Sequence, residues 1–141
     1  MNPGKPETLL AFDVGLRRTG VAIGQSQINT AQAAGQLVVT NGRFDWPKVD
    51  ALITEWQPDR VIVGDPGGDN PRLRKVINRL KSHIQQQHKL PILDVDETLT
   101  SAEANHQLSG AELSLERKVE LRDQIAACLI LESYFSSLNE S

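Results

Sequence analysis

Three strand-like segments near the start of the chain place the strongest constraint on its fold. Residues 8–12, 19–24 and 35–40 are short runs rich in apolar or β-branched side chains, a pattern that predicts β-strands. The links between them hold six and ten residues, whereas a crossover between parallel strands needs about a dozen or more. We therefore expect the three segments to pair as antiparallel neighbours.

The rest of the sequence alternates between strand and helix patterns. Asp45 and Pro47 are typical of a helix start, as the cap and a first-turn residue. The expected elements are a helix over 46–56, a strand over 60–64, a helix whose apolar stripe runs from 73 to 84, a strand over 91–95, and helices over 101–108 and 115–135. Three antiparallel strands, two strand–helix alternations and a closing helix describe an α/β fold around a mixed sheet. We expect residues 1–141 to form a single domain.

The composition excludes several classes of protein. An apolar fraction of 39% is enough to build a core, and the single cysteine rules out a disulfide framework or a cysteine-based zinc site. No apolar run approaches the roughly 20 residues that span a bilayer, and residues 1–6 lack the apolar stretch of a signal peptide. These features predict a soluble, cytoplasmic protein that does not bind a membrane.

The charges are unevenly distributed along the chain. The net charge is −3, yet residues 71–90 carry six basic side chains and no acidic one, while residues 91–141 carry three basic and ten acidic ones. A concentrated basic face can hold a phosphate backbone, although a solvated helix face explains the same pattern equally well.

Two predicted strands end in carboxylates at positions where a catalytic or metal-binding role is plausible from the sequence. Asp13 closes a buried strand, where an ionised carboxylate needs a partner, a hydrogen bond or a metal. Asp96 and Glu97 follow the strand over 91–95, at the edge of a parallel sheet where ligands gather. Glu97 shares the alternation of Leu93, whereas Asp96 does not. Structural roles stay open: Asp13 as a turn acceptor, and Asp96 or Glu97 as a helix cap.

Asp123 is the most unusual polar residue of the final helix. It lies in a stripe of apolar and small side chains that includes Val119, Ala126, Ala127 and Ile130, and this stripe is expected to face the sheet. Arg122 is expected to point elsewhere. Three carboxylates that converge from two strand ends and a helix suit Mg²⁺ or Mn²⁺, ions that activate water and stabilise the leaving oxygen of a phosphodiester.

Several motifs resemble the YqgF (RuvX) family, and the match is collinear over essentially the whole chain. They are LAFDVG at 10–15, RTGVAIG at 18–24, VIVG at 61–64, DETLTSAEA at 96–104 and RDQIAACLILESYF at 122–135. The resemblance implies a ribonuclease H-like fold with a five-stranded mixed sheet in the order 3-2-1-4-5. It also implies a metal-dependent nuclease that matures the 5′ end of the 16S ribosomal RNA precursor or, alternatively, resolves Holliday junctions in branched DNA.

The same resemblance implies the site residues. Asp13, Glu97 and Asp123 would be catalytic, and together with Asp96 they would hold Mg²⁺ or Mn²⁺. Contacts to the nucleic acid are expected from six basic residues: Arg17, Arg18, Arg72, Arg74, Lys75 and Arg79.

The sequence departs from the family pattern in two places. Thr98 stands where the family has an arginine, so that Arg17, Arg18 or Arg72 would have to supply the phosphate contact. The loop over 64–70 is shorter and contains Asp65, which either joins the metal site or, the favoured reading, is a turn residue.

Other functions and partners stay open. An RNA-binding assembly factor without catalytic activity would keep the fold, and a junction resolvase would act as a symmetric dimer, so the chain is either a monomer or a homodimer. An actin-like ATPase would need a far longer chain. The three histidines, His83, His88 and His106, show no metal-ligand spacing, and Cys128 is expected in the core.

Overall fold

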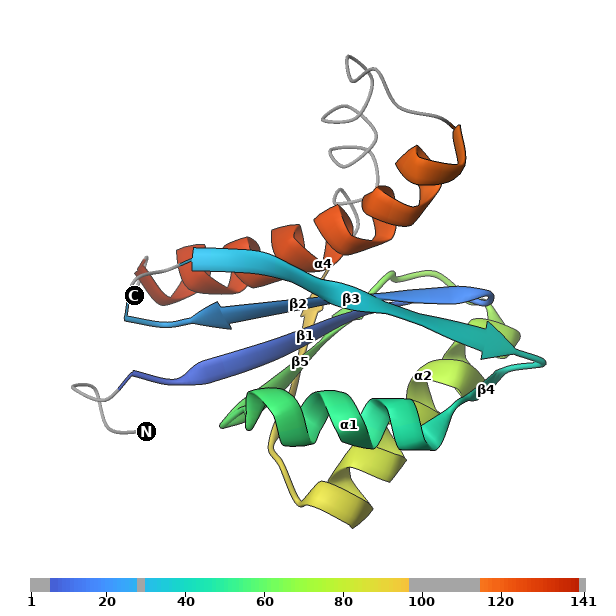
Figure 1. Cartoon of the computed structure of the whole chain (residues 1–141), viewed down its shortest axis with the longest axis horizontal. Helices are drawn as coiled ribbons and strands as arrows, with labels where there is room; N and C mark the ends of the chain where they lie inside the picture. The colour runs from blue at the N-terminus through green and yellow to red at the C-terminus, as the bar shows by residue number, and fades with distance from the viewer. Residues whose placement is uncertain (1–5, 28–29, 97–114, 140–141) are drawn as a thin grey trace.

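A single mixed β-sheet organises the molecule, with helices on both faces (Figure 1). The computed structural model describes residues 6–27, 30–96 and 115–139. The strands are β1 (Thr8–Val14), β2 (Arg18–Gln25), β3 (Thr30–Thr40), β4 (Arg43–Phe44), β5 (Arg60–Asp65) and β6 (Ile92–Asp96). The helices are α1 (Trp46–Trp56), α2 (Pro71–His83), the π-helix η1 (Ile84–His88) and α4 (Leu115–Asn139). None of the helices in these ranges is long and apolar enough to cross a bilayer.

The strand order is β4-β3-β2-β1-β5-β6. Strands β1, β2 and β3 pair antiparallel, as their short links predicted, and β1, β5 and β6 pair parallel. The expected order 3-2-1-4-5 is confirmed, but the sheet has six strands and not five. The additional strand, β4, is two residues long and follows a hairpin turn in which Asn41 and Gly42 both have positive φ, 53° and 73°. Asn-Gly is a favoured pair for such a turn.

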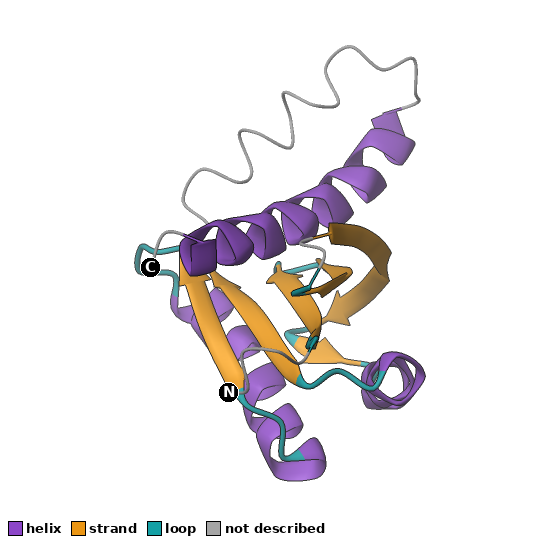
Figure 2. Cartoon of the chain, turned by 90° about the vertical axis from the view of Figure 1, so that its left-hand side faces the viewer, coloured by secondary structure: helices purple, strands orange, loops and turns teal. Residues whose placement is uncertain are grey.

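Two clusters of buried side chains separate the layers of the fold. Along β1, Leu10, Phe12 and Val14 face α1 and α2, whereas Leu9 and Ala11 face α4. Successive side chains of a strand point to opposite faces, so every strand residue can be assigned to one layer. Figure 2 shows α4 lying across one face of the curled sheet, opposite the other helices.

Several element boundaries differ from the sequence-based expectation. Strand β3 begins five residues earlier than expected, because a bulge at Ala34, followed by Gly35 at φ 131°, lets the pairing with β2 continue. Asp45 occupies the N-cap of α1 without a side-chain capping bond. The cap of α2 is Asn70, whose Oδ1 accepts a hydrogen bond from the Leu73 backbone.

The helix predicted around residues 73–84 changes its winding at the end. The α-helical part stops at His83 and continues as the π-helix η1, which ends at Lys89 with φ 55°. Helix α4 runs four residues beyond the expected end at 135. The helix expected over 101–108 lies outside the described residues.

Candidate functional site

Asp13 lies at the end of β1 on the face covered by α4. It follows Leu9 and Ala11 in the alternation of the strand, and both of these pack against α4. In the antiparallel register Asp13 is opposite Gly20 of β2, with a Cα separation of about 4.5–5.5 Å typical of such pairs. The carboxylate is partly buried.

Gly20 allows α4 to approach the sheet at this point. A Cβ atom built on Gly20 would overlap the backbone carbonyl of Asp123, so any side chain there would push the helix away. The same glycine pairs with Asp13 on one side and with Gln36 of β3 on the other. The backbone of Asp123 therefore lies over the strand next to Asp13, and the two predicted metal ligands share one face and one end of the sheet.

The Asp123 carboxylate is largely buried and held by cationic and amide donors. Its Oδ2 accepts a hydrogen bond of 3.1 Å from Arg18 Nε and another of 3.1 Å from Gln36 Nε2. Its side chain is 14% exposed, whereas Arg18 is 39% exposed and reaches inward from the rim. Arg122 was expected to point elsewhere, but its Nη2 lies 3.7 Å from Asp123 Oδ1, because the side chain of a helix residue can bend back toward its neighbour.

This environment fits a divalent cation in its donor chemistry. Asp13 and Asp123 offer carboxylate oxygens, the donors that Mg²⁺ and Mn²⁺ prefer. Asp123 Oδ2 is already compensated by the positive charge of Arg18, while Oδ1 is too far from Arg122 for a hydrogen bond.

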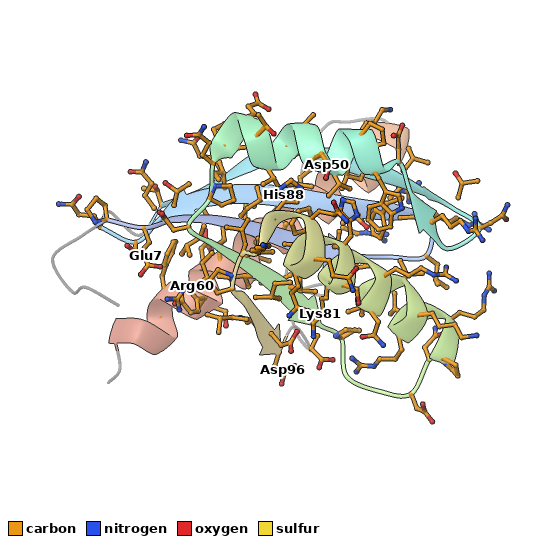
Figure 3. All side chains as sticks on the ribbon, turned by 90° about the horizontal axis from the view of Figure 1, so that it is seen from below. Glu7, Asp50, Arg60, Lys81, His88 and Asp96 are labelled. Carbon is orange, nitrogen blue, oxygen red and sulfur yellow. The ribbon has the colours of Figure 1, made fainter. Side chains whose placement is uncertain are left out.

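The remaining candidate ligands are Asp96, the last residue of β6, and Glu97, which follows it in the sequence. Leu93 and Val95 of β6 pack with the α4 cluster, so Asp96 belongs to the opposite face. There it lines a surface pocket of about 340 Å³ with Asp65, Arg74 and Asp94, and Figure 3 shows it at the tip of β6. Glu97, the next residue, lies outside the described residues, and its role stays a prediction.

Asp65 is the last residue of β5, and its side chain binds the turn that follows, in agreement with the favoured turn role. Its Oδ1 accepts hydrogen bonds from Arg74 Nη2 at 2.8 Å and from the Gly67 backbone at 2.9 Å. The Arg74 guanidinium, followed by the Gly67 N–H, lowers the pKa of this carboxyl. Asp65 shares the alternation of Val61 and Val63, which face α2, so it is directed away from the layer that contains Asp13.

A basic groove lies on the rim next to the β1–β2 turn. Its volume is about 570 Å³ and its walls come from that turn, from the β3–β4 hairpin and from α2. The groove is lined by four cationic residues, Arg17, Arg72, Lys75 and Arg79. In the described part of the chain, no carboxylate is among its lining residues. Arg79 Nη1 also donates a 2.7 Å hydrogen bond to the Gly42 carbonyl, which ties α2 to the hairpin.

The six predicted nucleic-acid contacts therefore divide into three groups. Four line the basic groove, Arg18 binds Asp123, and Arg74 binds Asp65. Arg17 and Arg18 are consecutive, yet the first lines the groove and the second reaches the α4 face.

Sequence reasoning missed one cluster of polar side chains. Asp50, His83 and His88 converge on the side of α1 and α2, although the two histidines are five residues apart. In an α-helix of 3.6 residues per turn, such residues point roughly 140° apart, so their spacing gave no signal. Only the π-helical turn brings them together, and nothing in the sequence pattern predicts it.

Cys128 fits its expected structural role. It packs against the cluster between α4 and the sheet, and burial raises the pKa of its thiol to about 11. The thiol is therefore protonated near neutral pH and is not an activated nucleophile.

Known proteins resemble this chain in sequence along nearly its whole length. Residues 7–137 match the family model RuvX, described as Holliday junction resolvase. A Haemophilus ducreyi protein named "Putative pre-16S rRNA nuclease" is 38% identical, covering 92% of this chain and 96% of its own. A Yersinia enterocolitica protein of the same name is 39% identical, covering 91% and 94%.

Solved structures show the same fold at low sequence identity. The fowlpox virus resolvase in complex with Holliday junction DNA has a TM-score of 0.59 at 18% identity, covering 93% of this chain and 98% of its own. RuvC from T. thermophilus, also with a Holliday junction, has a TM-score of 0.54 at 13% identity, covering 95% and 96%. These likenesses confirm the predicted ribonuclease H-like fold.

Proposed function

The chain belongs to the RuvX family, and from that premise we propose that it is a divalent-metal-dependent nuclease that matures the 5′ end of the 16S ribosomal RNA precursor in the cytoplasm. The observation that carries the proposal is the close contact between the Asp123 backbone carbonyl and Gly20 of β2. Gly20 pairs with Asp13 of β1. The close contact of the Asp123 backbone with β2, next to Asp13, supports a site in which the two carboxylates would share a cation.

Asp13, Glu97 and Asp123 would hold Mg²⁺ or Mn²⁺, with Asp96 as the alternate residue of its pair. When bound, the metal supplies activation of a water and stabilisation of the leaving oxygen. Asp13 and Asp123 come from the α4 face. Since Asp96 is assigned to the opposite face, Glu97 is the better candidate for the third ligand.

Arg18 would fill the role of the arginine that the family has at the position of Thr98. It is the cation whose Nε lies 3.1 Å from a proposed metal ligand, Asp123. The Arg18 guanidinium would contact a phosphate next to the scissile bond, where its planar donors suit a bidentate contact.

The basic groove would bind the nucleic acid backbone away from the cleaved bond. Arg17 lines the groove, and its chain neighbour Arg18 reaches the carboxylates. A nucleic acid strand that crosses the β1–β2 turn would thus pass from the basic groove, at Arg17, to Arg18 beside the carboxylates. Tryptophan and phenylalanine residues are absent from the lining of the groove within the described chain, which favours recognition of backbone charge and shape over base stacking.

Holliday junction DNA is the alternative substrate. The family model carries the resolvase description, and both structural neighbours were solved with junctions. The curated relatives, which are far more similar in sequence, carry the ribosomal RNA name, and this difference in identity favours RNA.

A side-by-side cleavage assay tests the proposal. A labelled 16S precursor and a four-way DNA junction are incubated with the full chain in Mn²⁺ or in chelator, and Asp13→Asn is purified identically. We expect Mn²⁺-dependent cleavage of the RNA that the variant lacks. Cleavage of the junction alone would establish the alternative substrate. Binding of the RNA without cleavage, unaffected by Asp13→Asn, would identify an assembly factor and overturn the nuclease.

A further inference from the structure

A second polar cluster lies on the face of the molecule opposite to Asp123. His83 Nε2 and His88 Nε2 each lie 2.7 Å from the same oxygen, Asp50 Oδ1. Asp50 belongs to α1, His83 is the last residue of α2, and His88 is the last residue of η1. Figure 3 shows Asp50 and His88 facing each other between these helices.

The π-helical turn makes this convergence possible. A turn closed by i→i+5 hydrogen bonds holds more residues than an α-helical turn, so residues five apart come closer to one face. Such turns are rare in proteins, and those that occur are frequently found at functional sites. Here the turn begins directly after His83 and ends at His88.

The three side chains offer metal-ligating atoms at suitable separations. One imidazole nitrogen from each histidine and one carboxylate oxygen from Asp50 all lie within 4.8 Å of one another. Tetrahedral ligands at about 2.0–2.2 Å from a zinc ion lie roughly 3.3–3.6 Å apart, so small side-chain rotations suffice. The histidines are 16% and 19% exposed, whereas Asp50 is 43% exposed, which leaves one side of the cluster open to water and to an entering ion.

One histidine is already oriented for this task. The Trp46 ring stacks on the His83 ring, with 4.1 Å between centroids and 15° between planes. Such packing fixes the plane of the imidazole, as the surroundings of metal-bound histidines generally do. It also places an intrinsic fluorophore next to the proposed ion.

We propose that Asp50, His83 and His88 bind one divalent cation of the borderline class, for which zinc is the type, and that this ion joins α1 to the end of α2. Two imidazoles and one carboxylate suit zinc, nickel, cobalt or copper, whereas the all-oxygen set around Asp13 suits Mg²⁺ or Mn²⁺. A water completes the coordination at the open side. This site is independent of the proposed nuclease activity, since it uses none of the same residues.

Zinc titration of the full, chelator-stripped chain tests this site. We expect one zinc ion per chain at this cluster, and a thermal midpoint raised by on the order of 10 °C when the free zinc concentration is a hundred times Kd. Asp50→Asn and His88→Ala should each weaken this binding at least tenfold and abolish most of the shift. Asp50→Asn is nearly isosteric and is the variant least able to disturb folding. Cu²⁺ should quench the Trp46 emission in the wild type and much less in Asp50→Asn.

Two controls separate this site from other zinc ligands. Gln87→Ala removes an exposed neighbour in the same π-helical turn and should bind zinc like the wild type. Asp123→Asn should likewise keep the site, because it alters only the opposite face. The proposal is overturned if the wild type shows no saturable zinc binding, or if Asp50→Asn and His88→Ala bind zinc as tightly as the wild type.

Discussion

The two faces of the sheet pack their helices in different ways. Toward α4, strand β2 presents the small residues Gly20, Ala22 and Gly24 after Arg18 at its start, and the helix backbone touches the strand at Gly20. Toward α1 and α2, β1 and β2 present large apolar residues, among them Phe12 and Val21, which keep the helices at the distance of interlocking side chains. Close contact thus belongs to one layer only.

This difference explains where the charged groups lie. On the α4 face, close approach leaves Asp123 largely buried beside β2, where a carboxylate needs a compensating cation. On the other face the helices stand further out, and their rims carry the basic groove and the histidine cluster. The proposed catalytic site thus lies in the layer with close contact, and the proposed polyanion and zinc sites lie in the other layer.

The largest effect on the close packing between α4 and β2 is expected from one added methyl group at Gly20. Gly20→Ala puts a Cβ into the backbone carbonyl of Asp123, so we expect a loss of stability at the upper end of the ~1–3 kcal/mol typical of overpacking and a loss of cleavage. Urea unfolding and the cleavage assay measure both. Ala33→Ser, which adds one atom at an exposed position of β3, should change stability by less than about 0.5 kcal/mol. A fully stable, active Gly20→Ala would show that α4 does not need this contact.

The next test compares one carboxylate from each face. Asp123→Asn should reduce metal-dependent cleavage by more than about a hundredfold, because changes even to groups behind metal ligands cost about 10–100-fold. Asp96→Asn, on the opposite face, should reduce it only a few-fold. The rate at saturating Mn²⁺ is the measurement. Equal losses in both variants would mean that the site spans the end of the sheet and is not confined to the α4 face.

A smaller effect is expected from the basic groove. The double variant Arg72→Gln/Lys75→Gln removes two lining charges and should lower the slope of log affinity against log salt by about 0.7–0.9 per charge, with little change in the cleavage rate at saturation. Filter binding over a range of salt concentrations measures the slope. Arg43→Gln/Lys48→Gln removes the same charges from outside the groove and should leave the slope nearly unchanged. Equal slopes in both double variants would remove the groove from the model.

The smallest effect is expected at the Asp65–Arg74 pair. Arg74 and the Gly67 N–H lower the pKa of Asp65 below its usual value of 3.8, so the pair stabilises the fold fully above about pH 4, and the contribution is lost as the pH falls through the lower folded pKa. Asp65→Asn should therefore be slightly less stable than the wild type at pH 7, and the difference should shrink as the pH falls below about 4. Both side chains are about 40% exposed, which keeps the difference small. A stability difference that grows toward acid would refute this assignment.

Most of the fold could be predicted because it rests on local patterns. The short links of the first strands predicted their antiparallel pairing, and the alternation along β6 predicted that Asp96 does not share the face of Leu93; both agree with the structure. The two-residue strand β4 was missed because a strand so short has no periodicity of its own. The π-helix was missed because its winding depends on tertiary contacts, such as those of His83 and His88 with Asp50.

The candidate site was predictable only in part. The burial of Asp123 among small residues was visible as a polar residue within an apolar stripe. Its partners were not, because Arg18 and Gln36 are 105 and 87 residues away in sequence and meet it only through the sheet. Arg17 lines the basic groove, whereas Arg18 reaches the α4 face. This division likewise could not be predicted, because it depends on the conformation of the β1–β2 turn.

The central claim is that metal-dependent cleavage depends on the carboxylates of the α4 face. The most direct test measures cleavage of one labelled 16S precursor in Mn²⁺ by the wild type, Asp13→Asn and Asp94→Asn, the last altering a carboxylate on the opposite face that binds Lys81 at 2.9 Å. We predict that Asp94→Asn cleaves like the wild type, while Asp13→Asn binds the RNA but does not cut it. Wild-type cleavage by Asp13→Asn would contradict the account.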